Sequence, residues 1–194
     1  MGPAETGFEH DTDADSGDRS GGPGSRVEAR ASGGVPHDEY APGQDRPLAG
    51  YAVLIGVYGA AVAAGAVALR RRRRSLPEVR PVDVVLVGVA THKLARRMSK
   101  DSVMSPLRAP FTRYEGLSGP GELQEGVRGS GVRKAVGELV SCPFCLSQWV
   151  ATGFTFGLLA APRATRWAAS VFASLALADF LQFAYAWAEQ QAGR

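Results

Sequence analysis

Two cysteines, Cys142 and Cys145, stand three residues apart in the stretch "GELVSCPFCLSQWVATG", which runs directly into a long apolar segment. Proline is well tolerated at the first position of a helix, so Pro143 places Cys142 at a helix N-cap, close to backbone N–H groups that lack partners. The helix dipole favours a thiolate at that position. The pair is therefore a candidate redox centre.

Metal binding and a plain structural role are the two alternatives for these thiols. A tetrahedral zinc site usually needs four ligands, and the pair supplies two of them. His92 with Asp101 or Glu138 could complete such a site, whereas His10 and His37 belong to a polar tail. Because the spacing does not require a metal, the structural, redox and metal roles all stay open.

The residues Cys-Pro-Phe-Cys also look like the glutaredoxin signature Cys-Pro-Phe/Tyr-Cys. A thioredoxin-like fold would need a strand before the motif and a βαβ unit around it. Here the motif leads into an apolar segment instead, so the likeness is confined to four residues.

Asp179 is the other residue whose type and place point to chemistry. A carboxylate near the middle of a membrane span is costly and often marks a functional path. Gln182 lies one turn later on the same face, and we expect Gln148, Thr152 and Thr155 to offer polar partners across a helical hairpin. A protonated Asp179 that hydrogen-bonds neighbouring helices is the favoured interpretation, and a proton or solute path is the alternative.

Three apolar segments could hold helices that cross a membrane. Residues 48–69 contain no charge over 22 positions, and at about 1.5 Å per residue they would cover a hydrocarbon core of about 30 Å. Residues 144–161 reach that length when the preceding turn is counted, and residues 167–188 form another full span. With "PRATR" as the loop, residues 142–188 predict a transmembrane hairpin.

The first segment carries two further signals. Small residues recur on one face at every fourth position, a spacing that lets a partner helix approach closely. These residues are Ala52, Gly56, Ala60, Ala64 and Ala68. Such a ladder also arises easily in any span rich in Ala and Gly, and that explanation is favoured. Five consecutive arginines follow and are typical of a topology anchor on the cytoplasmic side, a role favoured over nucleic-acid binding. They are Arg70, Arg71, Arg72, Arg73 and Arg74.

Residues 82–98 fit a spanning helix poorly, because their apolar part, residues 82–90, is only nine positions long and includes Asp83. Six arginines lie within residues 70–81, and nine Lys or Arg lie within residues 91–143. A crossing between them would put one basic stretch outside, against the positive-inside tendency. The sequence therefore favours a re-entrant or interfacial helix and three spans, with the tail outside and the C-terminus cytoplasmic. Four spans are the alternative.

The remaining segments are polar. Residues 1–46 hold ten Asp or Glu against four Arg and offer little apolar surface, which predicts a disordered acidic tail without a signal peptide. Residues 99–137 are rich in Pro and Gly and predict an irregular, basic, cytoplasmic loop. Its cations could meet lipid phosphates or a protein partner, and a basic loop that is merely solvated is the alternative. The cations are Arg108, Arg113, Arg128, Arg133 and Lys134.

Two stretches, "THKLARRMSKDSVMSPLRAPFTRYEG" and "GELVSCPFCLSQWVA", resemble the DUF1360 family of small bacterial membrane proteins, some of them described as sporulation-associated. The resemblance covers about residues 83–189. It is most specific at Lys100-Asp101, at "SPLRAPF" and at the Gly-Glu-Leu before the cysteines. It implies a spanning helix before the Lys/Arg pair, which favours four spans, and it implies no particular reaction.

The sequence thus predicts an all-α integral membrane protein with three or four transmembrane or membrane-embedded helices and a disordered N-terminal tail. After the tail come residues 47–74, with the first span and its anchor, and a family-like membrane domain over residues 82–189. We expect a multi-pass protein of the bacterial cytoplasmic membrane that contacts anionic lipid and the membrane helices of a partner or a second copy, without nucleic acid or a cofactor. A non-enzymatic interaction or assembly role is favoured. A membrane-bound thiol-disulfide protein that uses Cys142 and Cys145, and a path through Asp179, are the alternatives.

Overall fold

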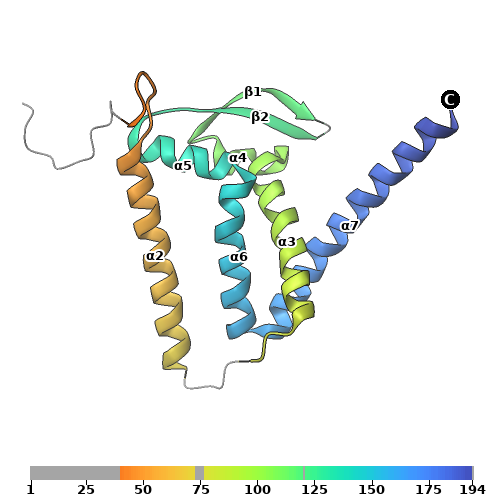
Figure 1. The fold of residues 1–194 in the computed structure, drawn as a ribbon, viewed down its shortest axis with the longest axis horizontal. Coiled ribbons are helices and arrows are strands. Elements are labelled where there is room, and N and C mark those ends of the chain that lie inside the picture. The colour runs from red at the N-terminus through yellow and green to blue at the C-terminus, as the bar shows by residue number, and fades with distance from the viewer. Residues whose placement is uncertain (1–39, 73–76, 120, 194) are drawn as a thin grey trace, which may run out of the picture. The chain divides into compact units, whose positions relative to one another are not determined.

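The computed structural model describes residues 40–72, 77–119 and 121–193, and Figure 1 shows their arrangement. The predicted tail up to residue 39, with His10 and His37, lies outside the described residues, as do Arg73 and Arg74. The elements in chain order are α2 (Leu48–Arg71), α3 (Pro81–Lys100), η1 (Ser102–Met104), α4 (Ser105–Arg108), β1 (Thr112–Gly119), β2 (Glu122–Val127), α5 (Gly131–Ser141), α6 (Pro143–Ala160) and α7 (Pro162–Ala192). The mostly helical class is confirmed, and a small sheet is added to it.

Helix α2 begins at the predicted residue and ends two residues later than expected, with Arg70 and Arg71 in its last turn. The side that faces the rest of the chain carries half-buried residues such as Leu54, Tyr58 and Gly65. The ladder of small residues from Ala52 to Ala68 is exposed instead. The described residues therefore use a different face of α2 for packing.

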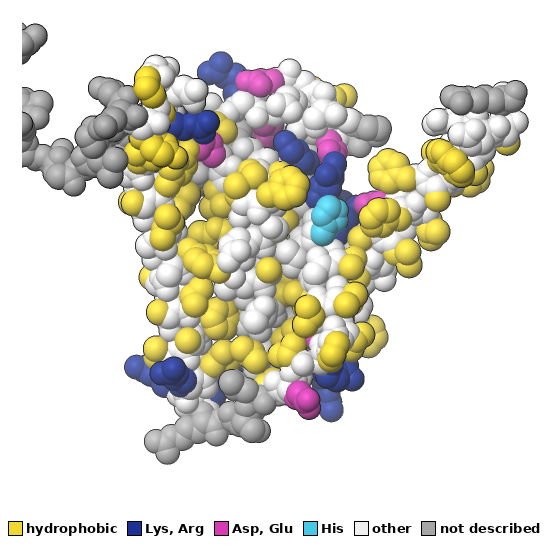
Figure 2. Space-filling view, in the orientation of Figure 1, with side chains coloured by type: hydrophobic (Ala, Val, Ile, Leu, Met, Phe, Trp, Pro, Cys, Tyr) yellow, Lys and Arg dark blue, Asp and Glu magenta, His cyan; other side chains and the backbone are white. Residues whose placement is uncertain are grey.

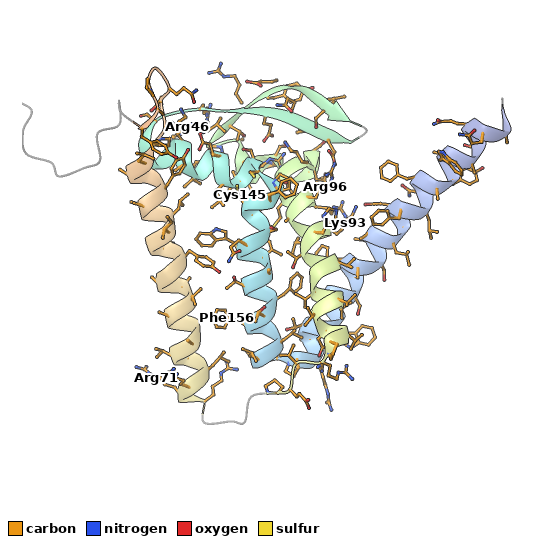
Figure 3. The ribbon with its side chains drawn as sticks, in the orientation of Figure 1. Arg46, Arg71, Lys93, Arg96, Cys145 and Phe156 are labelled. Carbon is orange, nitrogen blue, oxygen red and sulfur yellow. The ribbon has the colours of Figure 1, made fainter. Side chains whose placement is uncertain are left out.

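Helices α2 and α6 run in the same direction. Near the middle of α2 the Tyr58 hydroxyl lies 2.8 Å from the Thr152 Oγ1, and at its end the Arg72 guanidinium donates to the carbonyl oxygen of Ala160 at 3.5 Å. Figure 3 accordingly places Arg71 and Cys145 at opposite ends of the two helices. The three-span layout required α2 and α6 to run in opposite directions, so that expectation is wrong in this respect.

Helix α3 packs lengthwise against α6 and α7 rather than lying across an end of the bundle (Figure 1). Pro81 occupies its first turn, and the Asp83 carboxylate accepts the backbone N–H of Arg80 at 3.2 Å, which caps the helix start. Its buried face is lined by Val87, Ala90 and Ala95 among others. The predicted helix exists, but it belongs to the bundle.

By length and hydropathy, α2 and α7 are each suited to crossing a membrane. Helices α5 and α6 would supply a third crossing if they count as one broken span, because they are bent by 81° at their junction. The hairpin of α6 and α7 turns at Ala161 alone, so the predicted loop "PRATR" is wrong. Pro162 occupies the first turn of α7, where its missing N–H leaves no hydrogen bond unmade.

The predicted irregular loop contains an antiparallel hairpin in which Thr112 pairs with Val127 and Tyr114 with Glu125. The pairing shifts on either side of Gly116. The backbone φ of this residue is 149°, a value that glycine adopts readily and other residues rarely do. The shifts interrupt the alternation of side chains by which a strand is recognised in a sequence. Side chains from outside the hairpin hold it in place, as the next section describes.

Candidate functional site

Cys142 ends α5 and caps α6, as its place before Pro143 predicted. Its Sγ accepts the backbone N–H of Cys145 at 3.3 Å. Cys142 is half-buried and Cys145 is exposed, and both are free thiols. Figure 3 shows Cys145 at the end of α6 that meets α5. The pair thus stands at the 81° bend between the two helices.

The metal alternative finds no support in the described part of the chain, where no three His, Cys, Asp or Glu side chains come together in a way that could hold an ion. His92 faces α7, in a groove described below, rather than joining Cys142 and Cys145. Within residues 40–72, 77–119 and 121–193, the sheet is the two-stranded hairpin β1-β2. It provides no βαβ unit for a thioredoxin-like site.

Asp179 forms an ion pair with Lys93 of α3, which the sequence analysis did not foresee. The side chain of Lys93 is only 15% exposed, whereas that of Asp179 is 44% exposed. The partners expected from α6 are engaged elsewhere: Gln148 and Thr152 both contact the Tyr58 hydroxyl of α2, and the Thr155 hydroxyl donates to a carbonyl oxygen of its own helix. The expected hydrogen bonds across the α6–α7 hairpin are therefore wrong.

Replacing Lys93 with methionine will leave Asp179 without its cation, and we expect the free energy of unfolding in detergent to fall by roughly 1–2 kcal/mol. The matched control exchanges the charges, Lys93→Asp with Asp179→Lys, and should recover at least half of the loss because the two side chains still attract each other. Equal stability of Lys93→Met and the parent, or no recovery in the exchanged pair, would show that the pair is not a stabilising contact.

A second ion pair fastens the hairpin to the helices. Arg108 is 1% exposed and Glu125 is 6% exposed, and their side chains pair through Nε–Oε2 at 2.7 Å and Nη2–Oε1 at 3.1 Å. The same guanidinium donates to the carbonyl oxygens of Met98 at 2.8 Å and Asp101 at 3.0 Å. Thr112 adds a hydroxyl at 3.2 Å from Glu125. The expectation that Arg108 meets lipid is wrong, because this side chain is fully enclosed.

The carboxylate of Asp101 organises the short turn between α3 and α4. The backbone N–H of Val103 donates to it at 3.1 Å, and the Arg97 side chain approaches it at 2.9 Å. These contacts hold the pKa of Asp101 below its usual range. Asp101 and the "SPLRAPF" motif thus build one structural joint around Arg108.

The Gly-Glu-Leu motif before the cysteines is explained by close packing. A Cβ on Gly137 would lie 2.6 Å from Val127 Cγ1 and 2.9 Å from the Phe111 carbonyl oxygen, so only glycine lets α5 approach the hairpin this closely. Glu138 accepts a hydrogen bond from the Tyr51 hydroxyl of α2. The motif therefore joins α5 to both the sheet and α2.

A third ion pair lies at the other end of α3. Asp83, whose side chain is 2% exposed, receives both guanidinium donors of Arg166 at 2.8 Å each. Sequence reasoning missed Arg166, Lys93 and Glu125 as partners. The signal that could have found Lys93 is that a lysine and an aspartate facing the same apolar bundle must pair to be tolerated there.

These polar clusters stabilise the fold, and none of them has the nucleophile–base arrangement of an active site among the described residues. Among the described residues, the two free thiols of Cys142 and Cys145 stay the candidate for thiol chemistry.

The family described as "Protein of unknown function (DUF1360)" matches residues 86–185. A relative named "Sporulation protein YjcA", from Bacillus subtilis (strain 168), is 31% identical over 102 residues, which are 51% of this chain and 86% of the relative. No solved structure matches the chain. The match takes in most of α3, the hairpin, α5 and α6 and most of α7, and it leaves out α2 and the tail. The chain therefore belongs to the DUF1360 family, as the motifs around Arg108 and the two cysteines predicted.

Proposed function

We propose that the chain is a multi-pass membrane protein that acts by binding lipid and other membrane helices rather than by catalysis. The observation that carries this proposal is the uncovered apolar surface of α2, in which none of the most apolar 18-residue window is buried. Only 11% of the corresponding window of α7 is buried. Figure 2 shows hydrophobic side chains along the helices and Lys and Arg side chains at both ends. Contact of such an apolar surface with the hydrocarbon core of a bilayer is favourable, whereas its contact with water is unfavourable.

The proposal includes α3 as a fourth crossing. Its 20 residues extend for about 30 Å, the thickness of a hydrocarbon core. The ion pairs of α3 with Arg166 and Asp179 of α7 show that the two helices run in the same direction. The charged residues of α3 give it a low hydropathy. Because the ion pairs neutralise these charges within the bundle, α3 can still be accommodated in a membrane.

Arg108, Asp83 and Lys93 are each engaged by a carboxylate or a guanidinium within the fold. Because these charged side chains hold the helices and the hairpin together, they support an assembly role rather than a catalytic one. The relative bears the name of a sporulation protein. We extend to this chain, as part of the proposal, a role in the membranes of a sporulating bacterium.

Labelling from one side of the membrane tests the four crossings. In a chain with Cys142→Ser and Cys145→Ser, the variants Val79→Cys and Val103→Cys place single thiols on exposed residues at the two ends of α3. We expect a membrane-impermeant maleimide to label one of them in intact cells and the other only in opened vesicles. Labelling of both from the same side would show that α3 does not cross.

The thiol-disulfide reaction is the second candidate, favoured by the exposed Cys145 beside a capping Cys142. The same reagent applied to the parent chain, with and without prior reduction, separates the two functions. Labelling without reductant is expected for the assembly role. Labelling only after reduction would establish a disulfide and put the redox function first. A path through Asp179 is the weakest candidate, because Lys93 already engages that carboxylate.

A further inference from the structure

A groove of about 840 Å³ opens between α3, α7 and the tip of the hairpin. Figure 1 shows why it exists: α7 diverges from α3 toward its C-terminus, while the tip of β1 and β2 extends above the gap. Figure 3 shows Lys93 and Arg96 on the side of α3 that faces α7. The groove thus has one wall from α3 and the hairpin and another from α7.

The wall from α3 and the hairpin is polar, and the groove as a whole carries a net positive charge. Four cations and three carboxylates line the groove when His92 is counted as neutral. The carboxylates of Asp101, Glu122 and Asp179 pair with Arg97, Arg96 and Lys93 in that order. Lys100 has no such partner among the described residues, so the groove has one positive charge in excess.

The wall from α7 is mostly apolar, apart from Asp179, which is paired with Lys93, and Gln182. Phe180 is 66% exposed and Phe183 is 73% exposed, and both line the groove. Leu175 and Ala186 extend this wall by about one turn on either side. In Figure 2 the hydrophobic side chains of α7 stand directly beside the basic side chains and the histidine. A molecule that fills the groove must therefore present an anion on one side and hydrocarbon on the other.

We propose that this groove binds one anionic phospholipid, with its phosphate beside Lys100 and Arg96 and its acyl chains along Phe180 and Phe183. The single excess charge matches the single charge of a phosphodiester, and the exposed phenylalanines match acyl chains. The proposal rests on the membrane location proposed above. A second copy of the chain fits less well, because α2, whose apolar window is left uncovered, contains no acidic residue that could neutralise Lys100.

Native mass spectrometry of the full chain, purified in detergent, tests this proposal. The probes are phosphatidylglycerol, phosphatidylcholine with the same acyl chains, and glycerol 3-phosphate. We expect one phosphatidylglycerol per chain, retained at least tenfold more strongly than phosphatidylcholine. Lys100→Gln should weaken its retention about fivefold, and Phe183→Ala should also weaken it. Arg128→Gln removes the same charge from an exposed residue outside the groove and should have no effect.

Equal retention of the two lipids, or equal effects of Lys100→Gln and Arg128→Gln, would overturn the proposal. Equally strong binding of glycerol 3-phosphate would show an anion site without a role for lipid. A stable dimer that excludes phosphatidylglycerol would assign the groove to a second copy. The maleimide labels at residues 79 and 103 report the membrane location separately, so the groove proposal can fail while the crossings stand.

Discussion

Replacing Arg108 with alanine will lower the free energy of unfolding by about 3–5 kcal/mol, because it leaves the Glu125 carboxylate enclosed without its cation. The substitution also removes the donors to the carbonyl oxygens of Met98 and Asp101. We expect the hairpin to separate from the end of α3. The measurement is unfolding in detergent, together with the amount of chain that accumulates in the membrane.

Two further variants serve as controls for the Arg108 substitution. Arg113→Ala removes an exposed cation of the same hairpin and should change stability by less than about 0.5 kcal/mol. The double variant Arg108→Met with Glu125→Leu removes both charges and should be much milder than Arg108→Ala, since no unpaired ion remains. If the double variant is as unstable as the single one, packing rather than charge explains the effect.

Replacing Gly137 with alanine will destabilise the chain by about 1–3 kcal/mol, although alanine ordinarily favours a helix over glycine by about 1 kcal/mol. The added Cβ would overlap Val127 and the backbone carbonyl of Phe111, and a backbone atom cannot move aside as a flexible side chain can. Thermal unfolding in detergent measures the loss.

The control for this substitution is Gly153→Ala in α6, where nothing lies within 4 Å of the added Cβ. Here we expect no loss, or a gain of up to about 1 kcal/mol. The two alanines should therefore have effects of opposite sign. A gain at both positions would mean that α5 does not press against the hairpin.

The helices were predictable because their apolar runs are long and their ends carry strong signals. Residues 48–69 anticipated α2 to within two residues, and Pro143 was enough to place Cys142 at a helix N-cap. The hairpin was not predictable from alternation, because Gly116 interrupts the register and because its anchor, Arg108, lies outside both strands. Long-range contacts of this kind leave no local pattern in a sequence.

The direction of the helices was the harder problem. Counting basic residues gave weight to charges that the fold uses internally, such as Arg108 and Lys93, which pair with Glu125 and Asp179. A buried arginine reports on packing and carries little information about sidedness. The partner of Asp179 was missed for a related reason, since Lys93 was assigned to a re-entrant or interfacial helix outside the bundle of spans.

The two ion pairs between α3 and α7 also have a consequence during synthesis, because they can form only after α7 has been made. Asp83 is made long before Arg166, and Lys93 long before Asp179, with 83 and 86 positions between the partners. When α3 leaves the ribosome, Lys93 lacks its carboxylate and Asp83 has only the neighbouring Arg80. If α3 crosses the bilayer as proposed, a charge without its full set of partners is costly in hydrocarbon. We therefore expect α3 to wait at the insertion machinery, or at the bilayer surface, until the last helix arrives. In a nascent chain that stops before α7, α3 would therefore not yet be stably inserted.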